Sequence, residues 1–178
     1  DILYLSASMP RLDVSESGQS IIVPGFHLSF IWMDDHWSHV IGICTDDSLI
    51  SSHVAFSVEQ RDDIGRVTSP LFQELSFQRS PDNKEIQQAL LVGQCGPHHF
   101  SAVFAIRESQ HEILLTVDVA DRCRNGVEAL SSTYAVDLPF GDLVDANPLQ
   151  ICWRIPATIN SYLSFESIHP TRVDLRES

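Results

Sequence analysis

The chain is expected to be an all-β domain, an antiparallel two-sheet β-sandwich, with a barrel as the alternative. Two observations predict this fold: apolar residues alternate with polar ones along most of the chain, and short turn motifs separate the alternating runs. Alternation with a period of two is typical of strands that bury one face and expose the other. The sandwich is favoured because packing sheet on sheet buries one apolar face per strand.

The strand pattern recurs in chain order from the first half of the sequence to its end. Residues 26–32 place Phe26, Leu28, Phe30 and Trp32 on one face, and residues 71–77, 113–119, 149–155 and 159–165 repeat the pattern. Two segments contain helix formers, residues 121–131 and 139–146, but Asn125-Gly126 and Gly141 weaken both of them. We therefore expect at most one short helix.

Turn residues punctuate these runs, among them Pro24-Gly25, Asp34-Asp35 and Gly96-Pro97. The stretch Gly93 to Phe104, GQCGPHHFSAVF, places a thiol and two imidazoles within five residues. It is interpreted as strand, turn and strand, with Ile86 to Gln94 running into the turn and His98 to Arg107 returning. Successive strand side chains face opposite ways, so His98 and His99 do not join the same site.

Length and charge restrict the classes of function. A chain of 178 residues is expected to form one β-sandwich domain, 1–178, with a core of its own. The 24 acidic residues against 11 basic ones give a formal charge of -13, which disfavours nucleic acid and anionic lipid as partners. No apolar run reaches the length of about 18 residues that a membrane span needs, so no membrane insertion is expected. The compartment, whether cytoplasmic or exported, and the oligomeric state are left open.

The cysteines and histidines are candidate metal ligands. Cys44, Cys95, Cys123 and Cys152 are widely spaced and are expected to be free thiols rather than disulfides. Cys95 and His98 have a zinc-like spacing, but no second close pair of ligands follows. The residues Asp35, His36 and His39 form the candidate site for a divalent cation, the one cofactor considered. The alternative is a hairpin whose tip carries polar side chains.

Catalytic templates are absent from the sequence. It contains no G-x-S-x-G elbow, no G-x-G-x-x-G motif after a strand and no P-loop. Cys95 beside His98 or His99 suggests a thiolate nucleophile, which requires a base within hydrogen-bond reach and a third group to orient that base. Trp32 and Trp153 are expected in the core. Trp37 either stacks on a sugar ring or a partner, or begins the apolar face Trp37, Ile41, Ile43.

Three blocks resemble a group of uncharacterised bacterial proteins: Ser69 to Leu75 (SPLFQEL), Ala89 to Ser101 (ALLVGQCGPHHFS) and Leu130 to Tyr134 (LSSTY). The pattern of that group runs S-P-P-L-Q-x-L, L-L-V-G-x-x-G-x-x-H-W-S and L-G-S-T-Y. In this register His99 and Ser101 match its His and Ser, whereas Phe100 replaces its Trp and Ser131 its Gly. The resemblance brings no activity with it, but it directs attention to His99 and Ser101.

These observations favour a non-catalytic binding domain for a carbohydrate or a protein. Its expected ligand-binding residues are Trp37, His99 and Ser101. The alternative function is a metal-dependent enzyme or metal-binding protein that uses His and Asp side chains at hairpin tips.

Overall fold

The structure is a computed structural model that describes residues 11–15, 18–44, 51–58, 69–79, 86–108, 113–123, 132–136, 142–146, 150–155 and 161–166. All regular structure in these ranges is β-strand, which confirms the predicted all-β class. Within them, no helix is found that could cross a membrane. Contacts divide the chain into two compact units, Asp1–Val136 and Asp137–Ser178. The prediction of a single domain over 1–178 stays a prediction.

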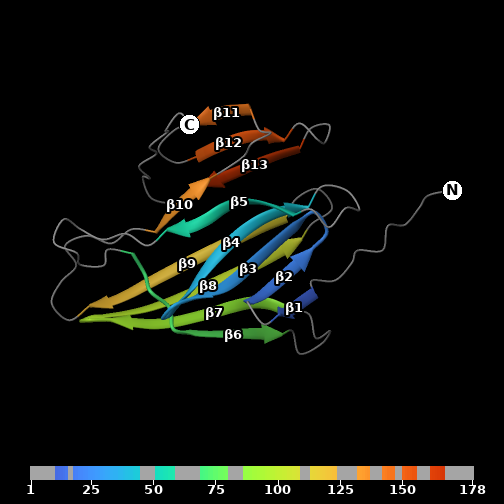
Figure 1. Cartoon of the computed structure of the whole chain (residues 1–178). Coiled ribbons are helices and arrows are strands. Elements are labelled where there is room, and N and C mark those ends of the chain that lie inside the picture. Colours follow the sequence, from blue (N-terminus) through green and yellow to red (C-terminus); the bar gives the residue numbers. More distant parts are fainter. Residues whose placement is uncertain are drawn as a thin grey trace. The chain divides into compact units, whose positions relative to one another are not determined.

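The first unit contains a six-stranded antiparallel sheet (Figure 1). Five consecutive strands form a meander, and a later strand, β10, pairs with the fifth. The strands are β1 (Arg11–Ser15), β2 (Gly18–Val23), β3 (Phe26–Met33), β4 (His36–Cys44), β5 (Ser51–Val58) and β10 (Thr133–Val136).

A four-stranded antiparallel meander forms the second sheet of the same unit. Its strands, in spatial order, are β6 (Glu74–Arg79), β7 (Ile86–Cys95), β8 (His98–Glu108) and β9 (Ile113–Cys123). Each sheet has two open edges, so the strands do not close into a barrel. The prediction of a two-sheet sandwich is therefore confirmed.

The second unit contains three antiparallel strands, β11 (Asp142–Ala146), β12 (Gln150–Ile155) and β13 (Ser161–Glu166). β11 falls inside residues 139–146, which the sequence offered as a helix candidate. A strand forms instead, because its backbone groups pair with β12, with Leu143 opposite Trp153. In the other helix candidate, 121–131, residues 121–123 end β9 and the rest lies outside the described residues.

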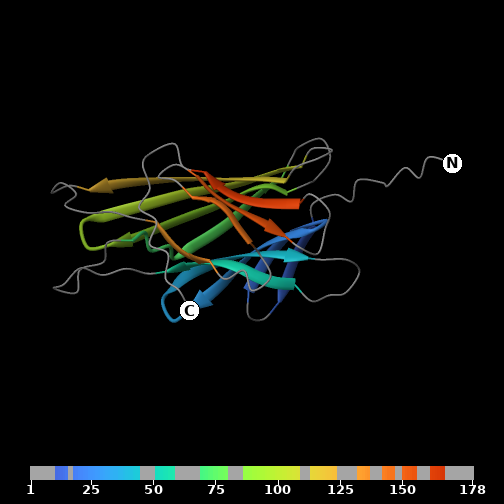
Figure 2. The same ribbon diagram turned by 90° about the horizontal axis from the view of Figure 1, so that it is seen from above.

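The two sheets of the first unit stack as layers (Figure 2). Aromatic side chains fill the space between them. Phe30 of β3 lies edge-on to Phe77 of β6 and Phe104 of β8, with ring centroids 6.0 and 5.5 Å apart. Phe30 and Phe104 are fully buried. The alternation read from the sequence is thus the alternation between the core face and the outer face of each sheet.

Among the residues that the structure describes, three two-residue turns connect consecutive strands. Their flanking pairs are Val23 with Phe26, Met33 with His36 and Cys95 with His98. The predicted turns Pro24-Gly25, Asp34-Asp35 and Gly96-Pro97 are therefore confirmed. Gly25 and Gly96 have positive φ angles of 78° and 57°, and Asp34 has a φ of 52°. Tight hairpin turns require such angles, which glycine and, among other residues, aspartate accept most readily.

Residues 69–73, the crossing segment, lead into β6 and lie against β7. The backbone N–H of Gln73 donates to the carbonyl of Val92 at 2.9 Å, and the backbone N–H of Gln94 donates to Oε1 of Gln73 at 2.7 Å. A Cβ atom on Gly93 would overlap the carbonyl oxygen of Leu71, so only glycine allows this close crossing. β6 consequently begins at Glu74, three residues later than the predicted run 71–77.

The exposure of Trp32 and the state of three cysteines are also defined by the structure. Trp32 was expected in the core but is 45% exposed, because it lies at the end of β3, where its Nε1–H donates to the carbonyl of Asp34 at 3.0 Å. Cys95, Cys123 and Cys152 are thiols rather than disulfides, as expected. The side chains of Cys44 and Trp153 lie outside the described residues.

Candidate functional site

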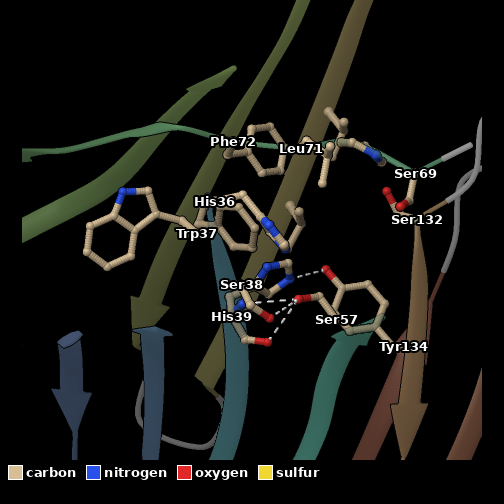
Figure 3. A pocket seen from close by; sticks show the side chains of 14 residues that line it. His36, Trp37, Ser38, His39, Ser57, Ser69, Leu71, Phe72, Ser132 and Tyr134 are labelled. Carbon is tan, nitrogen blue, oxygen red and sulfur yellow. Dashed lines mark hydrogen bonds between the residues drawn. The ribbon is translucent and has the colours of Figure 1, made fainter. Parts of the chain in front are cut away.

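A pocket lies between the two sheets of the first unit (Figure 3). Strands β4, β5 and β10 of one sheet, β8 and β9 of the other, and the crossing segment before β6 supply its walls. Its interior leaves about 40 Å³ for the centres of water-sized molecules, and the volume rises to about 490 Å³ when the open solvent at its mouth is included, so a ligand ring would lie partly in that mouth. The residues that line it are His36, Trp37, Ser38, His39, Ser57, Ser69, Pro70, Leu71, Phe72, Phe104, Val117, Val119, Ser132 and Tyr134.

His39 and Tyr134 form the polar centre of the pocket. Nε2 of His39 and the hydroxyl of Tyr134 share a hydrogen bond of 2.7 Å, and Figure 3 shows the two side chains pointing toward each other. The imidazole also packs edge-on against Phe104, with ring centroids 4.6 Å apart. This contact holds the His39 ring against the apolar wall of the pocket.

Burial keeps both groups uncharged near neutral pH. Desolvation lowers the pKa of His39 from 6.5 to about 4 and raises the pKa of the Tyr134 phenol above its usual value. His39 is therefore a neutral imidazole, which has one donor and one acceptor nitrogen, and Tyr134 keeps its hydroxyl proton. The pair presents hydrogen-bonding capacity without charge.

Ser57 of β5 links its strand to β4 next to the His39–Tyr134 pair. Its Oγ accepts a hydrogen bond from the backbone N–H of His39 at 3.0 Å and donates to the carbonyl of His39 at 3.2 Å. The hydroxyls of Ser38 and Ser57 are also hydrogen-bonded, at 2.9 Å. The position of His39 in the pocket is thus fixed by β5 as well as by its own strand.

The described residues that line the pocket carry hydroxyl groups but no carboxylate, ammonium or guanidinium group. Ser38, Ser57, Ser69, Ser132 and Tyr134 supply the hydroxyls. This contrasts with a chain whose formal charge is -13. The opposite wall is apolar and is formed by Leu71, Phe72, Phe104, Val117 and Val119. The pocket is consequently matched to an uncharged ligand that has hydroxyl or amide groups on one side and C–H groups on the other.

Trp37 lies at the boundary of this pocket. Its backbone N–H donates to the carbonyl of Phe72 at 2.7 Å, which ties the start of β4 to the crossing segment. Its indole projects away from His39 and Tyr134 in Figure 3 and packs edge-on against the half-exposed Trp32, with centroids 5.3 Å apart. The two indoles form an aromatic pair at the tip of the β3–β4 hairpin.

The candidate metal ligands do not assemble into one site. Nδ1 of His36 lies 2.9 Å from Oδ1 of Asp35, both near the hairpin tip, whereas His39 is buried against Tyr134. Among the described residues, no group of three His, Cys, Asp or Glu side chains is arranged to hold a metal ion. His36 and His39 share the pocket instead, as two members of its lining.

His99 and Ser101 lie on the outer face of β8, and both are exposed. The inner-face neighbours Phe100 and Ala102 are buried. Of the three expected ligand-binding residues, only Trp37 therefore contributes to the pocket.

Tyr134, Ser57 and Ser69 line the pocket but were not among the site residues predicted from the sequence. A lone tyrosine or serine in a strand gives no signal of its own, because its neighbours in space are distant in sequence. The three blocks of the resemblance do converge here, since Ser69 to Phe72, Ser132 and Tyr134 line the pocket and Gly93 admits the crossing segment. The signal available in the sequence was that Ser69 and Tyr134 belong to the blocks that carry the resemblance.

Comparison with known proteins adds no relative. No protein-family model matches this chain, and the searches of curated proteins and of solved structures gave no significant match either. Inference about function therefore depends on the chemistry of the pocket.

Proposed function

We propose that this chain is a carbohydrate-binding domain whose inter-sheet pocket takes one uncharged sugar residue. The observation that carries the proposal is the lining itself, in which the described residues combine five hydroxyls and the neutral imidazole of His39 with an apolar wall and include no Asp, Glu, Lys or Arg. A sugar ring has the matching surface, with hydroxyls around its edge and C–H groups on its faces. Hydroxyls that both donate and accept can satisfy such a ligand in a desolvated site.

The aromatic pair supports the choice of a carbohydrate over a peptide side chain. Trp32 and Trp37 lie beside the pocket, and Trp32 is 45% exposed. An exposed indole is a favourable surface for the C–H face of a second sugar residue. A chain of two or more sugars thus has both a pocket for its terminal residue and an aromatic surface beyond it.

Binding to a glycan array tests the proposal. Neutral hexose and N-acetylhexosamine termini should bind, whereas glycans ending in sialic or uronic acid should not, because no lysine or arginine among the described lining residues would pair with a buried carboxylate. Tyr134→Phe should weaken binding about tenfold, the value of one hydrogen bond. Retention of acidic glycans, or of none, would contradict the proposal.

A matched pair of serine variants controls for general effects on the sheet. Ser57→Ala removes a hydroxyl of the hydrogen-bonded pair that lines the pocket, and Ser29→Ala removes one from the similar pair Ser20–Ser29 elsewhere in the sheet. Only Ser57→Ala should reduce affinity. Equal losses in both variants would point to a loss of fold instead.

A further inference from the structure

A second polar cluster lies at the end of the four-stranded sheet, where β8 begins and β9 ends. His98 pairs in register with Cys123, and Phe100 pairs with Asp121. Alternation places these side chains on the inner face, the face of Phe100 and Phe104. None of the three polar residues lines the sugar pocket.

The three side chains make a chain of contacts. Nδ1 of His98 lies 2.8 Å from Oδ2 of Asp121, and Nε2 of the same ring lies 3.8 Å from Sγ of Cys123. The imidazole also stacks on Phe100, with centroids 5.5 Å apart and an interplanar angle of 7°. A thiol, an imidazole and a carboxylate are thus arranged in the order of a nucleophile, its base and the group that orients the base.

Asp121 provides an independent sign of function. Its side chain is only 4% exposed, and its Oδ1 has no hydrogen-bond partner within the described part of the chain. A buried carboxylate oxygen without a partner is costly, and such groups require an explanation. A positive charge on the neighbouring His98 ring would stabilise this carboxylate, and the ring gains that charge when it takes the proton of Cys123.

We propose that Cys123 is a nucleophile for acyl transfer, with His98 as its base and Asp121 as the positioning residue. The substrate class is a small ester or thioester. Sγ of Cys123 forms a bond to the acyl carbon, and the bond from that carbon to the leaving oxygen or sulfur breaks, its electron pair departing with the leaving group. The thiol proton moves to Nε2 of His98 and then to the leaving group.

Cys95 provides an internal reference in the same molecule. It pairs with His98 from the other side, on β7, and is half-buried like Cys123. Among the described residues, its sulfur makes no contact with the imidazole comparable to that of Cys123. The two thiols thus allow a comparison, within one molecule, of a sulfur that contacts His98 with one for which the described residues show no such contact.

The full chain treated with p-nitrophenyl acetate tests the proposal. Acetyl groups on each cysteine are counted by peptide mass spectrometry, and p-nitrophenolate release gives the rate. Cys123 should be acetylated at least tenfold faster than Cys95. His98→Gln should reduce the Cys123 rate about 100-fold, the contribution of a general base.

Asp121→Asn should lower the Cys123 rate about tenfold and change its pH profile, which a purely structural carboxylate would not do. Asp118→Asn and His99→Gln, at exposed positions of the same two strands, should leave the rate unchanged. Circular dichroism and melting temperature report whether each variant is folded. Equal acetylation of Cys95 and Cys123 in the unsubstituted protein, which requires no variant, would overturn the proposal, as would an unchanged rate in folded His98→Gln.

Discussion

His39 is the residue on which the chemistry of the pocket depends. It is 6% exposed, hydrogen-bonded to Tyr134 and packed on Phe104. Burial lowers its pKa to about 4, so the ring stays neutral throughout the physiological range. The same burial couples its protonation to folding, because the ring takes a proton more readily in the unfolded chain.

The stability of the protein should therefore depend on pH through His39. The ring takes its proton near pH 6.5 in the unfolded chain and only near pH 4 in the folded protein. The contribution of the neutral ring to the free energy of unfolding is therefore intact above pH 6.5 and is lost as the pH falls to about 4. Over this pH range the free energy of unfolding should fall by about 3 kcal/mol. Urea unfolding of the unsubstituted protein and of His39→Gln should give a stability difference that shrinks by this order between pH 7 and pH 4. The control His99→Gln, an exposed histidine, should follow the unsubstituted curve; a constant difference for His39→Gln would contradict the buried neutral ring.

At the scale of the element, the crossing segment 69–73 determines whether the apolar wall of the pocket includes Leu71 and Phe72. Its backbone lies so close to β7 that Gly93 has no space for a side chain. Leu71 and Phe72 are buried as a result, and both line the pocket. The glycine of one strand thus places two pocket residues of another segment.

Gly93→Ala should displace this segment and impair both folding and binding. We expect a loss of about 1–3 kcal/mol in the free energy of unfolding, typical of overpacking. Gly96→Ala is the matched control, because nothing lies within 4 Å of its added Cβ and only the positive φ of 57° opposes it. Gly96→Ala should cost about 1 kcal/mol and leave sugar affinity intact. Equal effects of the two variants on affinity would contradict this role of Gly93.

The sequence predicted the elements well because local pattern and turn chemistry decide them. Residues 26–32 and 113–119 became strands, and Gly96-Pro97 became the turn between β7 and β8. The pocket was harder to predict, because it depends on which strands meet across the sandwich. Tyr134 and His39 are 95 positions apart, and their hydrogen bond follows from β10 pairing beside β5. Trp37 was selected for its turn context, whereas His99 and Ser101 lie on the opposite face of their sheet.

On the scale of the whole first unit, the contact between the sheets is an aromatic cluster. Phe30 and Phe104 are fully buried and meet edge-on. Phe104→Ala should destabilise the unit by about 3–5 kcal/mol, whereas Val92→Ala, at a position that is 49% exposed, should cost less than about 0.5 kcal/mol. Chemical denaturation checks both values, and a small effect of Phe104→Ala would contradict the packing of the two sheets on each other.

Charge distribution across the molecule leads to a prediction about salt. The chain has a formal charge of -13, but the part of the pocket lining that the structure describes contains no carboxylate, lysine or arginine. Screening by salt weakens interactions between charges and leaves hydrogen bonds and apolar contacts nearly unchanged. The dissociation constant for a neutral sugar should therefore change less than about twofold between 50 mM and 500 mM sodium chloride. A steep loss of affinity with salt, measured by isothermal titration calorimetry, would instead indicate a charged ligand.

The most direct test of the central claim is an NMR titration of the labelled protein with the neutral sugar that binds best on the array. The claim is that the space between the sheets recognises this sugar. The predicted result is a set of saturable shifts at the methyl groups of Val117 and Val119 and at the rings of His39 and Tyr134, with His99 and Ser101 unaffected. Shifts confined to His99 and Ser101 on the outer face, or no shifts at all, would contradict the claim.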